Sequence, residues 1–86
     1  MTTIAPSWNL DVAGAQRLEP ELEAAEGAVE VDLTDVAFVA SSGLRVLLKH
    51  AQRLDKAGGS LVITNPSDTV REVLDMSGFS TILEVR

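Results

Sequence analysis

The sequence predicts an α/β domain, with a small, mostly parallel or mixed sheet of about four strands and about three helices mainly on one side. Segments typical of strands alternate along the chain with segments whose apolar residues recur every three or four positions, as they do in helices. This alternation requires crossover connections, which place neighbouring strands parallel. A chain of 86 residues has room for one such domain, over residues 1–86.

The first two predicted elements are a weak strand and a helix. Thr2–Leu10 is weakly strand-like, and Pro6 cannot donate to a ladder, so an edge or irregular strand is expected. A helix is expected over Asp11–Ala25. Its apolar residues share one face: Ala15, Leu18, Leu22 and Ala25. Pro20 disturbs it, which predicts either a kink or a regular part that starts near Glu19.

The middle of the chain holds a second strand and the clearest helix. Residues 29–33 alternate between apolar and acidic side chains, which indicates a strand. Thr34-Asp35 turns the chain, and Val36–Val39 is a short apolar continuation. The helix that follows has one apolar face: Leu44, Leu47, Leu48, Ala51 and Leu54. It is expected to end at Gly58-Gly59.

Three more elements complete the predicted order. Leu61–Thr64 is a short, continuous apolar strand, of the kind that is buried on both faces. Ser67 is a good N-cap for a third helix, whose apolar face carries Val70 and Leu74. The apolar residues of 79–85 suggest a last strand.

Composition excludes several classes of function. The net charge is −6, with 7 basic and 13 acidic residues, so binding to nucleic acid through phosphate contacts is not expected. No cysteine is present, which removes disulfides, thiolate metal sites and a cysteine nucleophile. No secretory signal and no apolar run of about 20 residues is found, so a cytoplasmic protein without membrane insertion is expected.

The segment Ser41-Ser42-Gly43-Leu44 carries the most chemistry, and it has two interpretations. In the structural one, a serine caps the helix and glycine lets the backbone approach closely. In the functional one, a serine at a helix N-terminus is an exposed modification site, because the helix dipole and free N–H groups stabilise an added phosphate. A partner laid over the turn would then be displaced.

Catalysis fits this segment poorly, so we expect no enzyme and no cofactor. A serine nucleophile needs a neighbouring base. The one histidine, His50, lies two turns along the helix, about 11 Å away, and is expected to be an exposed surface residue. Asp32 and Asp35 form no metal site, because no third ligand is apparent and Asp35 suits a turn.

The ordered set of motifs resembles the STAS family, the domain of anti-sigma factor antagonists and of sulfate-transporter tails. The resemblance runs from Asn9 onward, and no single motif in it is specific. Its parts, in order, are Leu10-Asp11, Val31-Asp32-Leu33-Thr34, Ser41-Ser42-Gly43-Leu44, Gly58-Gly59, Asn65-Pro66-Ser67, Val70-Arg71-Glu72-Val73-Leu74 and Ser77-Gly78-Phe79.

The resemblance implies a non-catalytic switch in signal transduction and transcription regulation. Such a domain binds an anti-sigma factor that is a serine kinase of the histidine-kinase-like ATPase fold. The kinase phosphorylates the serine before the glycine, the phosphoprotein lets go, and a PP2C-type phosphatase restores it. Ser42 is then the phosphate acceptor, with Ser41 as the alternative. The implied partner-binding residues are Asp11, Ser41, Ser42, Gly43, Leu44, Arg45 and Lys49.

The chain departs from the family pattern at Ala40, which stands where many phosphorylated members have aspartate. Short, solitary members also resemble a subunit that binds the ATPase of a lipid-transport ABC complex, and this or a sensory complex is the alternative function.

A basic stripe lies on the central helix, at Arg45, Lys49, Arg53 and Lys56. It is either a solvated face with some pairing to glutamates such as Glu19, or a docking strip for an acidic partner.

Overall fold

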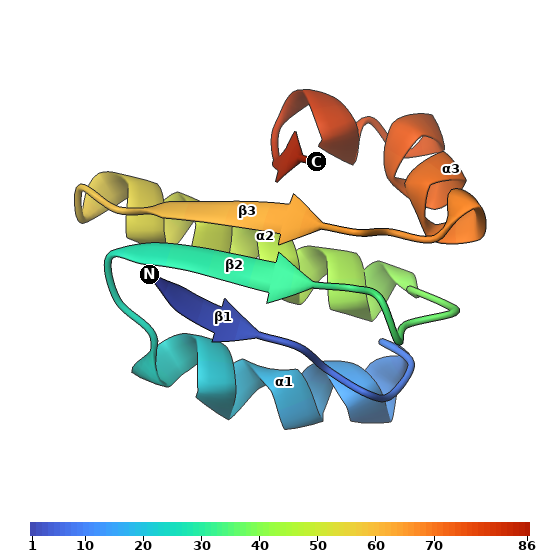
Figure 1. The fold of residues 1–86 in the computed structure, drawn as a ribbon, viewed down its shortest axis with the longest axis horizontal. Helices are drawn as coiled ribbons and strands as arrows, with labels where there is room; N and C mark the ends of the chain where they lie inside the picture. The colour runs from blue at the N-terminus through green and yellow to red at the C-terminus, as the bar shows by residue number, and fades with distance from the viewer.

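The computed structural model describes residues 1–86 and confirms the predicted α/β fold (Figure 1). The elements are, in order, β1 (Thr2–Ile4), α1 (Val12–Ala24), β2 (Ala28–Asp32), α2 (Ser41–Lys56), β3 (Ser60–Thr64), α3 (Asp68–Met76), the 3₁₀ turn η1 (Phe79–Thr81) and β4 (Glu84–Val85). No helix is both long enough and apolar enough to cross a membrane.

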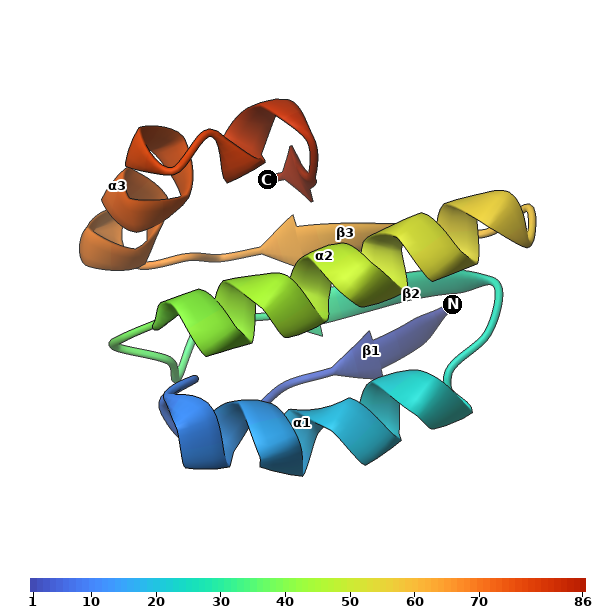
Figure 2. The same cartoon turned by 180° about the vertical axis from the view of Figure 1, so that it is seen from behind.

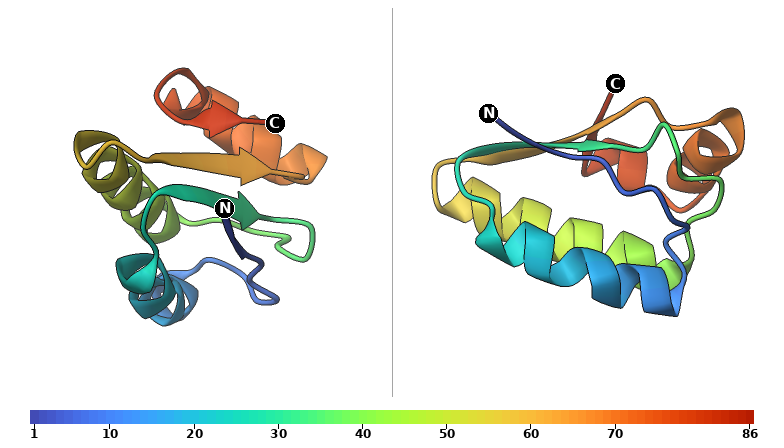
Figure 3. Two further views of the ribbon diagram at one scale, coloured as in Figure 1. Left: turned by 60° about the vertical axis from the view of Figure 1, so that its left-hand side comes forward. Right: turned by 60° about the horizontal axis from the view of Figure 1, so that its bottom comes forward.

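The four strands form one parallel sheet in the order β1-β2-β3-β4. Both α1 and α2 lie on one face of it, as predicted, and Figures 2 and 3 show them side by side. Helix α3 lies beyond the end of β3, away from that face. The opposite face carries polar side chains, where Glu30 accepts hydrogen bonds from Thr3 and Thr64 at 3.5 and 2.7 Å.

The core lies between the sheet and the two helices. Leu18 and Leu22 of α1 and Leu47 and Leu54 of α2 are fully or almost fully buried against the sheet. The strand residues on that face are equally inaccessible: Val29, Val31 and Ile63. Because the alternate residues of β2 face solvent, the predicted alternation of residues 29–33 follows directly from this one-sided packing.

Helix α1 differs from the prediction at Pro20. The helix begins at Val12, after an Asp11 N-cap, and continues through Pro20 to Ala24. The expected start near Glu19 is therefore wrong. Pro20 is exposed, so the carbonyl group of Gln16, which a proline cannot bond, is on an exposed residue that water can reach. Leu18 and Leu22, which lie on either side of Pro20 in the sequence, are buried in the core and keep the helix continuous there.

The first and the last predicted strands are shorter than expected. Only Thr2–Ile4 of the opening segment pairs with the sheet, and Val36–Val39 is a loop with one isolated bridge, between Leu10 and Val39. The last segment forms η1 before the two-residue β4. The cap at Ser67 is as predicted, because its hydroxyl accepts from the Val70 amide at 3.2 Å.

Candidate functional site

The predicted serine segment begins α2, but neither serine caps the helix. The N-cap is Ala40, and no side chain accepts a hydrogen bond from the first turn. The prediction that a serine caps this helix is therefore wrong, because Ser41 and Ser42 already lie inside it. The amide groups of Ser41, Ser42 and Gly43 have no acceptor in the protein. The head of α2 is left as an uncapped, positively polarised helix end.

The loop before α2 is fixed against the segment before α1. Leu10 donates to the Phe38 carbonyl at 2.9 Å, and the Ala40 amide donates to the Leu10 carbonyl at 2.8 Å. Gly43 packs on the same segment so closely that a Cβ atom would lie 2.7 Å from the Leu10 carbonyl oxygen. Asp11 and the serine segment are therefore held at the same end of the molecule.

A groove of about 260 Å³ runs between α1 and α2 from this end. Its lining residues are Val12, Ala15, Gln16, Glu19, Ser42, Arg45, Val46 and Lys49. Ser42 is half-buried in it, whereas Ser41 is exposed outside. We refer to it below as the Ser42 groove.

The structure brings some predicted partner-binding residues together and separates others. Ser42, Arg45 and Lys49 line the groove, and Arg45 is exposed without an ion pair. Asp11 is exposed but uses its carboxylate to accept from the Gly14 amide at 2.8 Å. Leu44 is 5% exposed and belongs to the core, so its side chain offers no docking surface.

Sequence reasoning missed two exposed apolar residues at this end. Val12 lines the groove and is 62% exposed, and Phe38 is half exposed in the loop before α2. Val12 lies off the apolar face of its helix, and an apolar residue at such a position is the signal that could have indicated it. These two side chains give the site an apolar component beside its charges.

His50 is the main correction at the residue level. It was expected on the surface, but it is 1% exposed. The reason is that α2 has a second buried flank, against α1, which the apolar pattern of α2 alone does not reveal. There His50 Nδ1 accepts from Arg53 Nε at 3.1 Å, and His50 Nε2 lies 3.2 Å from Glu19 Oε2 without the alignment of a hydrogen bond.

Two residues of the predicted basic stripe tie α2 to α1. Lys49 forms an ion pair with Glu19, as the pairing interpretation predicted. The Arg53 guanidinium donates to the carbonyl groups of Leu22 and Ala25 at 2.8 and 3.2 Å, and so provides hydrogen bonds for carbonyl groups at the C-terminal end of α1. We call Glu19, Lys49, His50 and Arg53 the interhelical network.

Electrostatics at the network follow from these contacts. The Lys49 ammonium hydrogen-bonds to Glu19 and holds the pKa of that carboxyl below its ordinary value of 4.5; His50 adds to the effect and desolvation opposes it. Glu19, Glu23 and His50 place one ligand atom each within 4.8 Å of one another. They suit a metal ion poorly, because Arg53 donates to Nδ1 and so leaves the proton of a neutral imidazole on Nε2.

Asp32 accepts hydrogen bonds that hold the turn after β2. Its Oδ1 accepts from the Thr34 hydroxyl at 2.6 Å, the Thr34 amide at 3.0 Å and Asn65 at 3.3 Å. These donors, with the Thr34 hydroxyl as the largest contributor, lower the pKa of Asp32. Asp32 thus fixes the turn after β2.

Comparison with known proteins places the chain in a family. Residues 8–84 match the family model described as "Mlab, STAS domain". BtrV of Bordetella bronchiseptica, assigned as an anti-sigma factor antagonist, is 40% identical over 77 residues, which cover 85% of this chain and 66% of that protein. The anti-sigma-B factor antagonist of Bacillus subtilis is 32% identical over 79 residues, covering 88% and 72%. The chain thus spans about two thirds of the length of BtrV.

Solved structures show the same fold. An anti-sigma factor antagonist assigned in Thermotoga maritima superposes with a TM-score of 0.85 at 19% identity, covering 96% of this chain and 77% of that one. SpoIIAA in its unphosphorylated form gives 0.80 at 22% identity, covering 98% and 77%. With the matching family model and the two sequence relatives, these likenesses show that the chain belongs to the STAS domain family, among the anti-sigma factor antagonists.

Proposed function

We propose that this chain is a phosphorylation-controlled antagonist, which binds an anti-sigma factor through the Ser42 groove and releases it when Ser42 is phosphorylated. The partner is a serine kinase of the histidine-kinase-like ATPase fold, and a PP2C-type phosphatase reverses the reaction. The observation that carries the proposal is the placement of Ser42, half-buried in a groove at an uncapped helix end. The names of BtrV and of the Bacillus subtilis relative support the antagonist role.

The groove has the composition of a docking site for a protein. Val12 supplies exposed apolar surface, and Arg45 supplies a cation without an intramolecular partner. Burial of an apolar contact beside a charged one is typical of the centre of specific interfaces. Gly43 contributes by allowing α2 to approach the loop before α1, not by contact with the partner.

A phosphate on Ser42 would change this surface without unfolding the domain. The free amides at the head of α2 and the Arg45 guanidinium stabilise about two negative charges on the folded chain. A partner seated in the groove would have to desolvate the same charges and lose its contact with Arg45. Since about 1.4 kcal/mol is a tenfold change in affinity, one phosphate is sufficient for release.

The proposal is tested by comparing Ser42 with its neighbour. The partner is first purified with the tagged chain from the native cell and identified by mass spectrometry. We expect Ser42→Asp to weaken its affinity at least tenfold, Ser42→Ala to bind normally, and kinase with ATP to add one phosphate to Ser42. Ser41→Asp is the matched control, because Ser41 is exposed outside the groove.

Three results would contradict the proposal. Equal affinity of Ser42→Asp and Ser42→Ala would remove the switch. Stable co-purification with a transporter ATPase, with no phosphate on the serine segment, would favour the lipid-transport role instead. Turnover of a substrate that is lost in Ser42→Ala would contradict a pure binding role, and we expect none.

A further inference from the structure

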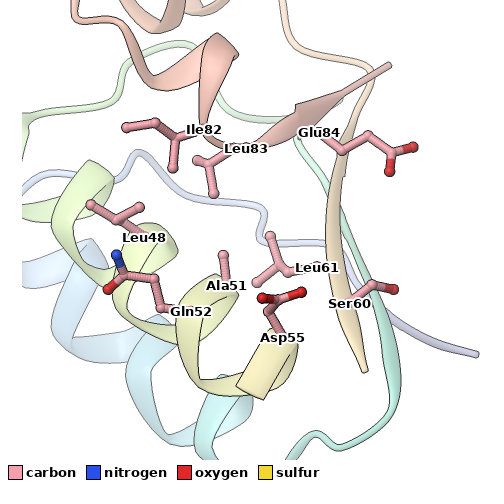
Figure 4. A pocket seen from close by; sticks show the side chains of 9 residues that line it. All are labelled: Leu48, Ala51, Gln52, Asp55, Ser60, Leu61, Ile82, Leu83 and Glu84. Atoms are coloured by element: carbon pink, nitrogen blue, oxygen red, sulfur yellow. The ribbon is translucent and has the colours of Figure 1, made fainter. Parts of the chain in front are cut away.

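The flank of α2 opposite the Ser42 groove is not covered by a helix. Its residues Leu48, Ala51, Gln52 and Asp55 recur at three- and four-residue intervals, so they form one stripe along α2. On this flank the stripe borders a groove of about 330 Å³ (Figure 4). Leu61 of β3 also lines it, and Ile82 and Leu83 of the C-terminal segment form the other side. We call this the C-terminal groove.

One end of the C-terminal groove is apolar. Leu48, Ile82 and Leu83 lie together there in Figure 4. Leu83 is buried, but Ile82 is 62% exposed at the rim. Together these side chains form one contiguous apolar patch, which a ligand could bury.

The other end is polar and carries one free negative charge. Asp55 and Ser60 lie there, and Asp55 forms no ion pair. The carboxylate of Glu84 points away from the groove in Figure 4 and is paired with Arg86 at 2.6 Å. No lysine or arginine lines the groove. Its shape and charge therefore favour an apolar ligand with a cationic end.

We propose that the C-terminal groove binds an amphipathic helix of a partner protein, with an apolar ridge and a lysine or arginine that meets Asp55. The stripe on α2 spans seven residue steps, about 10 Å, which matches two turns of a helix laid alongside it. Helices dock in this way through apolar anchors at three- and four-residue spacing. The partner helix would lie beside α2 and would extend the layer formed by α1 and α2 over the uncovered part of the sheet.

This surface is separate from the Ser42 groove, because the two lie on opposite flanks of α2. No residue lines both. A partner helix in the C-terminal groove could therefore remain bound while the Ser42 groove gains or loses its own partner. The inference does not depend on phosphorylation, and it can fail while the proposed function stands.

The test uses two synthetic helical peptides that share one apolar ridge and differ only in the charge of the flanking residues, lysine in one and glutamate in the other. Their binding to the ¹⁵N-labelled chain is followed by NMR. We expect the lysine peptide to shift the amide signals of Leu48, Ala51 and Ile82, and to bind about fivefold more tightly than the glutamate peptide, as expected for one exposed ion pair.

Variants separate this surface from the Ser42 groove. Ile82→Asp should weaken the lysine peptide at least tenfold, and Asp55→Lys should reverse the preference between the peptides. Val12→Asp, in the Ser42 groove, is the matched control and should change neither. Equal binding of both peptides, no binding at millimolar concentration, or shifts confined to the Ser42 groove would overturn the proposal. So would a dimer that Ile82→Asp dissociates, because the surface would then be occupied by a second copy.

Discussion

The two flanks of α2 differ in how their polar and apolar groups are satisfied. Toward α1, His50 is buried, and Arg53 bonds both its ring and the end of α1. Toward the C-terminal segment, Ile82 is exposed and Asp55 has no partner. One helix thus has a flank that is closed by the protein itself and a flank whose contacts remain to be made. Substitutions on the first should change stability, and those on the second should change binding.

The largest expected effect is on the closed flank. Arg53→Ala would leave His50 Nδ1 and the Ala25 carbonyl group without their donor, and would leave the Leu22 carbonyl group with the Ala25 amide alone. Buried acceptors without partners are costly, so we expect the free energy of unfolding to fall by about 3 kcal/mol. Urea denaturation measures it. Lys56→Ala, an exposed position on the same helix, is the control, and a similar small loss in both variants would show that the network is not stabilising.

The head of α2, between the two flanks, should gain stability from a cap. Ala40 provides no side-chain acceptor, so Ala40→Asp should raise the free energy of unfolding by about 1 kcal/mol. Ala40→Asn separates the cap from the charge, since asparagine accepts the same hydrogen bond without an ionic interaction with the helix dipole. If thermal denaturation shows no gain in either variant, the amides of the first turn are already satisfied by solvent.

Acid should weaken the closed flank through Glu19. The pKa of Glu19 is lowered in the folded state, so its contribution is fully present above about pH 4.5 and is lost as the pH falls through the lowered value. We expect Glu19→Gln to be less stable than the wild type by about 1 kcal/mol at pH 7. The difference should shrink as the pH falls below about 4.5 in urea titrations. A difference that is constant over this range would contradict the ionic origin.

The smallest effect is expected on the open flank. Ile82→Asp should change the free energy of unfolding by less than about 0.5 kcal/mol, because a side chain that is 62% exposed leaves little buried area to lose. Leu83→Asp is the contrast, since Leu83 is 3% exposed and packs in the core. Comparable destabilisation in both would mean that the C-terminal groove is part of the core.

The periodicity of apolar residues was sufficient to predict elements with one apolar face. It was insufficient to predict burial where an element has a second buried face. The alternation of residues 29–33 and the leucine spacing of α2 predicted a strand and a helix correctly. The predicted surface position of His50 is wrong because the residues that bury it come from α1, which is distant in the sequence. The helix start predicted near Glu19 is wrong because the core contacts of Leu18 and Leu22 offset the backbone hydrogen bond that is lost at Pro20. The sequence predicted that Ser42 lies at the head of the helix. It did not predict the groove around Ser42, because the other wall of that groove comes from α1 and includes Val12.

The uncovered face of the sheet has a practical consequence. Thr3, Glu30 and Thr64 form a hydrogen-bonded row there, on the side opposite α1 and α2. Thr3 is exposed at an edge strand and lines neither groove. The chain has no cysteine, so Thr3→Cys would introduce a unique attachment point for a fluorophore. Such a reporter leaves both flanks of α2 accessible, and occupation of each groove could be followed in the same sample.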